Sequence, residues 1–244
     1  MLYVTGDLHA MQRKWFEQIE PVLAPGDTLF VCGDFGVGFW GTNGRTEEAF
    51  FDTLAARNYT VAFVDGNHEN FDRLNAFPTT LWHGGRVHLL RPNLVHLTRG
   101  SLYQLDGLRL FAFGGGYSLD RARRVEGVSW WPQEMPSAQE YCRARQTLQQ
   151  ASRRVDVILT HTAPSETIFY LSSLHRTGIR PFVPEEQELN AFLSEVQQHT
   201  AYQHWYFGHF HTDDELWRRQ TAVFSTVREL LSGRIVRQWE PLEE

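Results

Sequence analysis

Five short segments of the chain carry side chains that bind divalent metal ions, and four of the five place a glycine beside them. They are Gly6-Asp7-Leu8-His9, Gly33-Asp34, Gly66-Asn67-His68-Glu69, Thr160-His161-Thr162 and Gly208-His209-Phe210-His211. Carboxylate, imidazole and amide groups are all metal donors in proteins. A neighbouring glycine lets the backbone turn sharply and approach an ion closely. A donor set of this size is enough for two metal ions, which indicates hydrolytic chemistry.

Each segment follows a short run of apolar, β-branched or aromatic residues, a pattern typical of buried strands. These runs occupy residues 2–5, 28–32, 61–64, 155–160 and 204–207. Ligands of α/β sheets gather outside the carboxyl ends of the strands. The sequence therefore predicts that the five segments meet at one rim of the fold, although they are distant along the chain.

The rest of the chain alternates helical and strand patterns. We expect helices over residues 12–22, 46–57, 71–77, 137–152 and 185–199, with Thr46 as the N-cap of the second. We expect further strands over residues 87–90, 94–97, 101–105, 108–113, 221–227 and 234–239, with a hairpin turn at Asp106-Gly107. Alternating elements followed by runs of strands predict two sheets packed face to face with helices outside.

Length and composition narrow the class of protein. The 244 residues suit a single α/β domain spanning residues 1–244. A net charge of −6 disfavours a protein that coats nucleic acid nonspecifically. The apolar runs are too short to span a membrane and the chain opens on a strand, so we expect a cytoplasmic enzyme. Cys32 and Cys142 are the two cysteines, which excludes a disulfide framework.

Taken in order, the segments from Asp7 to His211 resemble the motifs of the calcineurin-like metallophosphoesterase superfamily. The stretch from Gly114 to Trp131 is similar to small bacterial and phage-type members. The resemblance implies a four-layered α/β/β/α sandwich of two mixed sheets flanked by helices. It also implies hydrolysis of phosphoester bonds by a metal-bridging hydroxide.

The resemblance gives each motif residue a role. It implies that one ion is held by Asp7, His9 and His211, the other by Asn67, His161 and His209, and that Asp34 bridges both and is thereby catalytic. Two divalent ions are implied; manganese is the first expectation, and iron, zinc or nickel are alternatives because the mixed donor set does not select one metal. His68, next to a ligand, is implied to be the general acid that protonates the leaving oxygen.

The sequence departs from the protein Ser/Thr phosphatases of this superfamily after the second motif. Those enzymes continue with an Asp-Arg pair that orients the catalytic histidine and grips phosphate, whereas Val37 and Gly38 stand here. This disfavours a protein phosphatase and leaves the orienting partner of His68 open. We expect Arg121, Arg123 or Arg124 to bind phosphate instead, since arginine binds phosphate oxygens as a bidentate fork. A solvated basic turn is the alternative.

Aromatic residues beside these arginines have two interpretations. Tyr117 and Trp130 could flank a substrate cleft, whereas Trp130 and Trp131 could also cap the edge of a core. The histidines outside the motifs are expected to have core or surface roles; they are His83, His88, His96, His175, His199 and His204.

Three activities compete. We favour a phosphomonoesterase acting on a small molecule or phosphopeptide, because the arginine cluster supplies positive charge for a dianion. The alternative is a phosphodiesterase acting on cyclic nucleotides or nucleic-acid ends, which needs room for a second group. A non-catalytic scaffold is disfavoured because every metal position and His68 are intact. The expected partner is therefore a phosphorylated small molecule, peptide or nucleotide.

Overall fold

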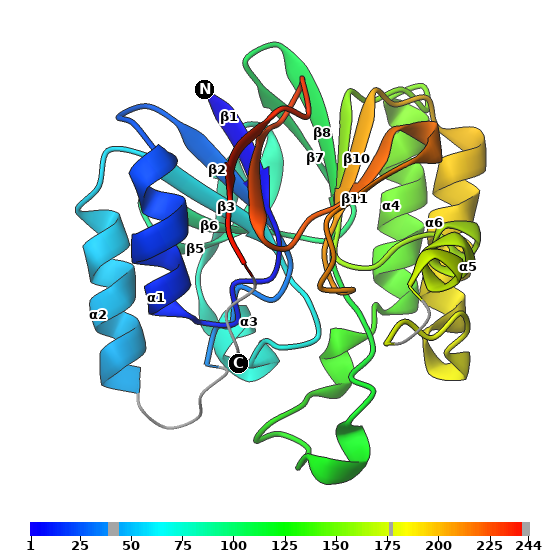
Figure 1. Cartoon of the computed structure of the whole chain (residues 1–244), viewed down its shortest axis with the longest axis horizontal. Coiled ribbons are helices and arrows are strands. Elements are labelled where there is room, and N and C mark those ends of the chain that lie inside the picture. The colour runs from blue at the N-terminus through cyan, green and yellow to red at the C-terminus, as the bar shows by residue number, and fades with distance from the viewer. Residues whose placement is uncertain (39–43, 176–177, 241–244) are drawn as a thin grey trace.

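The computed structural model describes residues 1–38, 44–175 and 178–240. Within them, the first sheet has eight strands (Figure 1). Their order is β14 (Ile235–Gln238), β13 (Thr226–Glu229), β1 (Leu2–Thr5), β2 (Thr28–Cys32), β3 (Thr60–Val64), β6 (Leu94–Leu97), β5 (Gly85–Arg91) and β4 (Thr79–Trp82). The central strands β1, β2, β3 and β6 are parallel, whereas β13 and β5 on either side run antiparallel to their neighbours.

The second sheet of the described chain has six strands. Their order is β11 (Asp214–Leu216), β12 (Gln220–Ala222), β10 (His204–Phe207), β9 (Val157–Thr160), β8 (Leu108–Phe113) and β7 (Ser101–Leu105). Strands β12, β10, β9 and β8 are parallel, and the two edge strands are antiparallel to them. Both sheets are therefore mixed, as expected, and each has parallel strands at its centre.

Helices cover the outer face of each sheet (Figure 1). On the side of the first sheet lie α1 (Gln12–Lys14), which continues through a π turn (Trp15–Ile19) and a 3₁₀ turn (Glu20–Val22), then α2 (Gly44–Ala55) and α3 (Phe71–Ala76). On the side of the second sheet lie α4 (Ala138–Gln150), α5 (Ser165–Leu174) and α6 (Gln187–His199).

Three apolar layers hold these elements together. One lies between α1, α2 and the first sheet, one between the two sheets, and one between the second sheet and α4 to α6. Strand β2 shows how this arises, since Leu29 and Val31 enter the first layer while Phe30 and Cys32 enter the second. A strand buried on both faces needs a continuous apolar sequence. The predicted four-layered sandwich is confirmed.

Several predicted elements differ from the structure. Helix α2 already begins at Gly44, so Thr46 lies inside it and the predicted N-cap is wrong. The strand expected over residues 221–227 is two strands, β12 and β13, in different sheets. The chain turns between them because the Asp213 carboxylate accepts the backbone N–H groups of Phe224 and Ser225. Strands β4 and β11 and helix α5 were not predicted, because they are short or lack a clear polar face.

Candidate metal centre

The motif segments meet at the carboxyl ends of β1, β2, β3, β9 and β10, which is the lower edge of the sheets in Figure 1. At this edge the backbone adopts the left-handed conformation at five motif residues, which aspartate and histidine tolerate better than most side chains. They are Asp7 (φ 32°), His9 (52°), Asp34 (49°), His209 (68°) and His211 (50°). The turns aim polar side chains from separate strands into one space.

Two motif glycines are required by close packing against the carboxylates. A Cβ atom on Gly66 would lie 2.0 Å from Asp34 Oδ1, and one on Gly208 would lie 2.5 Å from Asp7 Oδ1. Any larger residue would push the carboxylates out of place. The backbone therefore lies against the carboxylates at these two positions, as predicted, and only glycine leaves room for it.

Asp34 lies at the centre of the cluster. Its Oδ2 atom is 3.4 Å from His9 Nε2 and 3.4 Å from His161 Nε2. Within the described residues, two groups of three side chains bring their donor atoms within 4.8 Å of one another; they are His9, Asp34 and His68, and Asp7, Asp34 and His161. Because Asp34 belongs to both groups, it has the position that a bridging carboxylate needs.

The second group extends to Asn67 and His209. His161 Nε2 lies 3.1 Å from Asn67 Oδ1 and 3.2 Å from His209 Nδ1. His161 Nδ1 lies 2.9 Å from the Cys32 carbonyl oxygen, which only a donating N–H can approach so closely. In the neutral ring, Nε2 then carries the free lone pair, and it lies next to Asn67 Oδ1 and His209 Nδ1. The donor set therefore fits a metal ion.

Opposite charges dominate the electrostatics of this cluster. Burial alone would raise the pKa of Asp34, but the imidazoles of His161 and His68 hold it well below its usual range. Burial alone would lower the pKa of His161, yet Asp34 and Asp7 raise it to about 10. Burial lowers the pKa of His9 to about 3; the nearby Asp34 opposes this shift, whereas His68 and His211 reinforce it. Asp34 and Asp7 thus favour the charged form of His161, whereas burial keeps His9 neutral.

His211 lies at the rim of the same site. Its ring stacks on Phe224 at 4.4 Å between centroids and meets the His9 ring edge-on at 5.0 Å. Asp7, which is 1% exposed, accepts the backbone N–H of His209 through both carboxylate oxygens. All the predicted ligands are thus gathered at one edge of the sandwich.

Comparison with known proteins agrees with this geometry. The model of the family described as Calcineurin-like phosphoesterase matches residues 1–213. The chain belongs to this family. Its members use a dinuclear metal centre, and the described residues contain two candidate ligand groups for one.

Two further comparisons are with individual proteins. A lariat debranching enzyme of Schizosaccharomyces pombe (strain 972 / ATCC 24843) is 27% identical over 176 residues, which is 67% of this chain and 36% of that protein. The chain thus spans about a third of that relative's length. The crystal structure of phosphopantetheinyl hydrolase from Mycobacterium tuberculosis aligns with a TM-score of 0.44 and 18% identity, over 91% of this chain and 89% of that one. No helix in the described parts of this calcineurin-like phosphoesterase is both long and apolar enough to cross a membrane.

His68 adjoins the metal donors in this calcineurin-like fold. Its backbone N–H donates to Asp34 Oδ1 at 2.8 Å, and its ring lies 5.2 Å from that of His9. Burial lowers the pKa of His68, Asp34 opposes this, and the Arg124 guanidinium reinforces it. Arg124 is paired with Asp120 at 2.7 Å. Two oppositely charged residues from outside the expected Asp-Arg position, Asp120 and Arg124, therefore lie close to His68.

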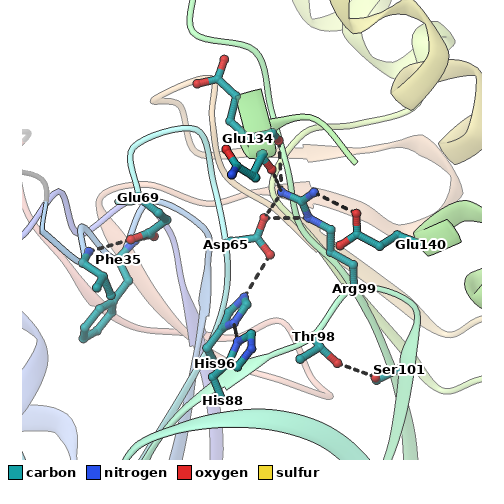
Figure 2. Close-up of polar contacts among 12 residues, drawn as sticks. Phe35, Asp65, Glu69, His88, His96, Thr98, Arg99, Ser101, Glu134 and Glu140 are labelled. Atoms are coloured by element: carbon teal, nitrogen blue, oxygen red, sulfur yellow. Dashed lines mark hydrogen bonds and ion pairs between the residues drawn. The ribbon is translucent and has the colours of Figure 1, made fainter. Parts of the chain in front are cut away.

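The loop at Val37 and Gly38 leaves no room for an arginine at position 38. Gly38 has a φ of +67°, and a Cβ atom on it would lie 2.7 Å from Asn70 Cβ. The loop is held by Glu69, which the sequence interpretation left without a role. Its carboxylate accepts the backbone N–H groups of Phe35, Gly36 and Val37 (Figure 2 draws the bond to Phe35). The sequence feature that could have indicated this role was the position of Glu69 directly after His68 in the third motif.

Arg121 and Tyr117 were predicted to bind substrate, and this stays a prediction. In the structure the Arg121 guanidinium lies between the rings of Tyr117 and Trp130, 4.1 and 4.2 Å from their centroids, and pairs with Glu134 at 2.7 Å. Glu134 is fully buried and also accepts the Ser118 hydroxyl. Arg121 therefore holds the segment that follows β8 in place.

The other residues of this segment have separate positions. Arg123 is exposed, and Arg124 is engaged with Asp120. Trp131 is 4% exposed, belongs to the first apolar layer and donates its Nε1–H to Asp72. Trp131 therefore caps the edge of a core, whereas Trp130 packs on Arg121.

Asp65, directly before the third motif, anchors a buried network (Figure 2). Its carboxylate accepts from Arg99 and from His96 Nε2, and His96 Nδ1 lies 2.9 Å from His88 Nδ1. Arg99 also donates to the carbonyl of Glu134. The network fastens the end of β3 to the segment after β8. His88 and His96 have the core roles predicted for them.

Lys14, the single lysine of the sequence, is a second residue that the sequence interpretation missed. Its side chain is buried, and Nζ donates to the carbonyl oxygens of Gly6, Asp7 and Phe224 at 3.3, 2.7 and 3.0 Å. Lys14 thus ties the first motif to the loop that carries Phe224, the residue on which His211 stacks. The sequence feature that could have drawn attention to Lys14 was its being the one lysine in an arginine-rich chain.

Proposed function

We propose that the gathered side chains hold two divalent ions, with Asp34 shared between them. The proposed ligands are Asp7, His9, Asp34, Asn67, His161, His209 and His211. Bound ions would supply an activated water and positive charge for the phosphoryl oxygens. The mixture of carboxylate, amide and imidazole donors suits manganese and is compatible with iron, zinc or nickel. What supports the assignment is that Asp34 belongs to both donor groups.

We propose His68 as the general acid. Asp34 fixes its backbone through the N–H bond, and a ring nitrogen of His68 lies within 4.8 Å of the donor atoms of His9 and Asp34. There it can pass a proton to the leaving oxygen. The adjacent pair of Asp120 and Arg124 can orient the ring and balance its charge.

The substrate that the site favours is a phosphodiester. The observation that carries this is the engagement of Arg121 with Glu134, because a monoester dianion needs more positive charge than a diester monoanion. Arg124 is likewise paired with Asp120. A cavity of about 560 Å³ beside His209 and His211 gives room for a second ester group. Phosphomonoesters are the second candidate, since Arg124 lies close enough to His68 to shift its pKa.

We further propose that residues 1–244 act as one catalytic domain. Strand β12, which lies beyond the family match, pairs with β10 of the second sheet, and β13 pairs with β1 of the first. Both sheets therefore continue past residue 213.

The test compares bis(p-nitrophenyl) phosphate with p-nitrophenyl phosphate in the presence of manganese. We expect kcat/KM to be about tenfold or more higher for the diester, and Asp34→Asn and His68→Ala each to lower kcat about a hundredfold or more. Asp106→Asn and His83→Ala, on exposed turns, are the matched controls. Turnover that survives Asp34→Asn would sink the mechanism, and faster cleavage of the monoester would reverse the substrate preference.

A further inference from the structure

His211 is the exposed member of the proposed ligand set. The other members are buried or partly buried; they are Asp7, His9, Asp34, Asn67, His161 and His209. Surrounding atoms hold a buried side chain in one orientation, whereas an exposed side chain changes rotamer within picoseconds to nanoseconds. A metal site binds tightly when neighbouring side chains lock the rotamers of its ligands. His211 therefore depends on the contacts that fix its ring.

Phe224 makes such a contact. The rings of Phe224 and His211 are stacked, with an angle of 6° between their planes and 4.4 Å between their centroids. Stacked aromatic rings attract each other beyond the effect of the area that they bury. The His211 ring also meets the ring of His9, a proposed ligand of the same ion, edge-on at 5.0 Å. The His211 ring thus lies beside His9 and cannot turn far without losing the stack.

Phe224 is itself held on both sides. Its backbone N–H donates to Asp213 Oδ1, and its carbonyl oxygen accepts from Lys14 Nζ, each at 3.0 Å. Asp213 follows His211 by two residues, so the first of these bonds joins Phe224 to the motif that carries His211. Lys14 Nζ also lies 4.6 Å from the centroid of the Phe224 ring, which is a favourable distance between a cation and an aromatic ring. The stacking partner of His211 is therefore fixed in place.

Phe224 stands outside the segments that carry the proposed ligands. It lies between β12 and β13, whereas the family match covers residues 1–213. A phenylalanine side chain has no donor atom for a metal ion. Any effect of Phe224 on metal binding must therefore pass through a neighbouring side chain, and His211 is the proposed ligand on which it stacks.

We propose that Phe224 is a positioning residue of the metal centre, which stacks on His211 and holds that ring ready to bind the ion assigned to Asp7, His9 and His211. The inference rests on the proposed metal centre. Loss of the Phe224 ring should weaken the binding of this ion, because His211 would have to give up more rotational freedom when it binds.

The second ion should bind with nearly unchanged affinity. Its proposed ligands are held by other contacts, among them those of Asn67 with Ser118 and of His161 with the Cys32 carbonyl oxygen. Loss of the stack should therefore affect the two ions unequally.

The test is calorimetric titration of the full chain, first freed of metal, with manganese chloride. Phe224→Ala should weaken the binding of one of the two ions about tenfold, since the loss of contacts that orient a metal ligand typically costs about that much. Phe224→Leu, which keeps apolar volume without a ring, should have the same effect and replaces Phe224→Ala if that variant does not fold. Phe169→Ala, at a 67% exposed position on α5, is the matched control and should bind both ions as the wild type does.

Two further variants separate positioning from a general loss of structure. Phe224→Tyr keeps the stacked ring and should restore the affinity for both ions. His211→Ala should weaken the same ion as Phe224→Ala. Adding Phe224→Ala to His211→Ala should have little further effect, because the residue through which Phe224 acts is then already gone. Urea denaturation of each variant checks that it is folded.

The outcomes distinguish this role from the proposed metal centre. If Phe224→Ala and Phe224→Leu bind both ions as tightly as the wild type, the role of Phe224 is overturned and the metal centre stands. An equal loss of affinity from Phe224→Ala in the wild-type and His211→Ala proteins also overturns it, because Phe224 then acts without His211. If the wild type binds no manganese, the proposed centre has failed, and the role of Phe224 fails with it.

Discussion

The side-chain amide of Asn67 donates from Nδ2 to Ser118 Oγ at 3.2 Å. Ser118 in turn donates its hydroxyl to Glu134 Oε2 at 2.9 Å and its backbone N–H to Glu134 Oε1 at 2.8 Å. Because Nδ2 faces Ser118, the Asn67 carbonyl oxygen Oδ1 faces His161. Ser118 therefore distinguishes the two ends of the amide and presents the oxygen to the proposed metal position.

Replacing Ser118 by alanine should weaken metal binding. Without the hydroxyl the Asn67 amide loses the partner that fixes its orientation, and loss of such supporting hydrogen bonds typically costs about tenfold or more in metal affinity. Titration calorimetry with manganese measures this directly. Ser173→Ala, on the exposed side of α5, is the control. Unchanged affinity in Ser118→Ala would mean that Ser118 does not orient Asn67.

Lys14→Met should destabilise the fold. The substitution leaves three carbonyl oxygens, those of Gly6, Asp7 and Phe224, without their charged donor. We expect the free energy of unfolding to fall by about 3 kcal/mol, since hydrogen bonds to charged groups are worth about 1.5–3 kcal/mol each and do not add fully. Urea denaturation measures the change. Arg13→Met, whose side chain is 73% exposed, should cost far less; an equal loss would contradict the assigned role of Lys14.

Arg99→Met should destabilise the protein more strongly. Arg99 and Asp65 are both almost fully buried, and the Arg99 guanidinium holds the pKa of Asp65 well below its usual range against the effect of burial. Removing one partner leaves an uncompensated buried carboxylate, at a cost of about 3–5 kcal/mol. Thermal or urea unfolding at neutral pH checks this, with the exposed Arg123→Met as control. A loss no larger than that of the control would refute the assignment.

Part of the acid sensitivity of the fold should come from His88. Burial, reinforced by His96 and Arg86 and opposed by Asp65, lowers its pKa from 6.5 to about 4. The unfolded chain then binds the proton more tightly than the folded one, so stability present above pH 6.5 is lost as the pH falls toward about 4. His88→Gln should reduce the difference between urea midpoints at about pH 7 and about pH 5. The exposed His83→Gln should preserve it, and an unaltered difference in His88→Gln would count against this explanation.

The strand pattern and the motif order were readable from local sequence. Strand β2 is buried at every position and apolar from Leu29 to Cys32, because both of its faces are covered. Such an apolar run predicts a buried strand without any knowledge of its neighbours. Thr46 shows the limit of this approach. Its type suits an N-cap, but the helix begins two residues earlier, at Gly44, and helix ends are where local patterns are least precise.

The supporting residues could not be predicted in the same way. Glu69 binds backbone groups 32 to 34 residues away in sequence. One partner of Lys14 lies 210 residues away, and Ser118 binds Asn67 across 51 residues. No local pattern encodes such contacts. Arg121 is a similar case, since the cluster of basic residues gave no sign of its pairing with the buried Glu134.

By itself the sequence determined the sandwich architecture and the family and predicted a set of metal-binding side chains, because each depends on short motifs that end strands. Only the tertiary structure decided how those side chains are held. It placed Asp34 in both donor groups and turned the Asn67 oxygen toward His161 through Ser118. These relationships depend on distance and burial, which arise only when distant segments pack together.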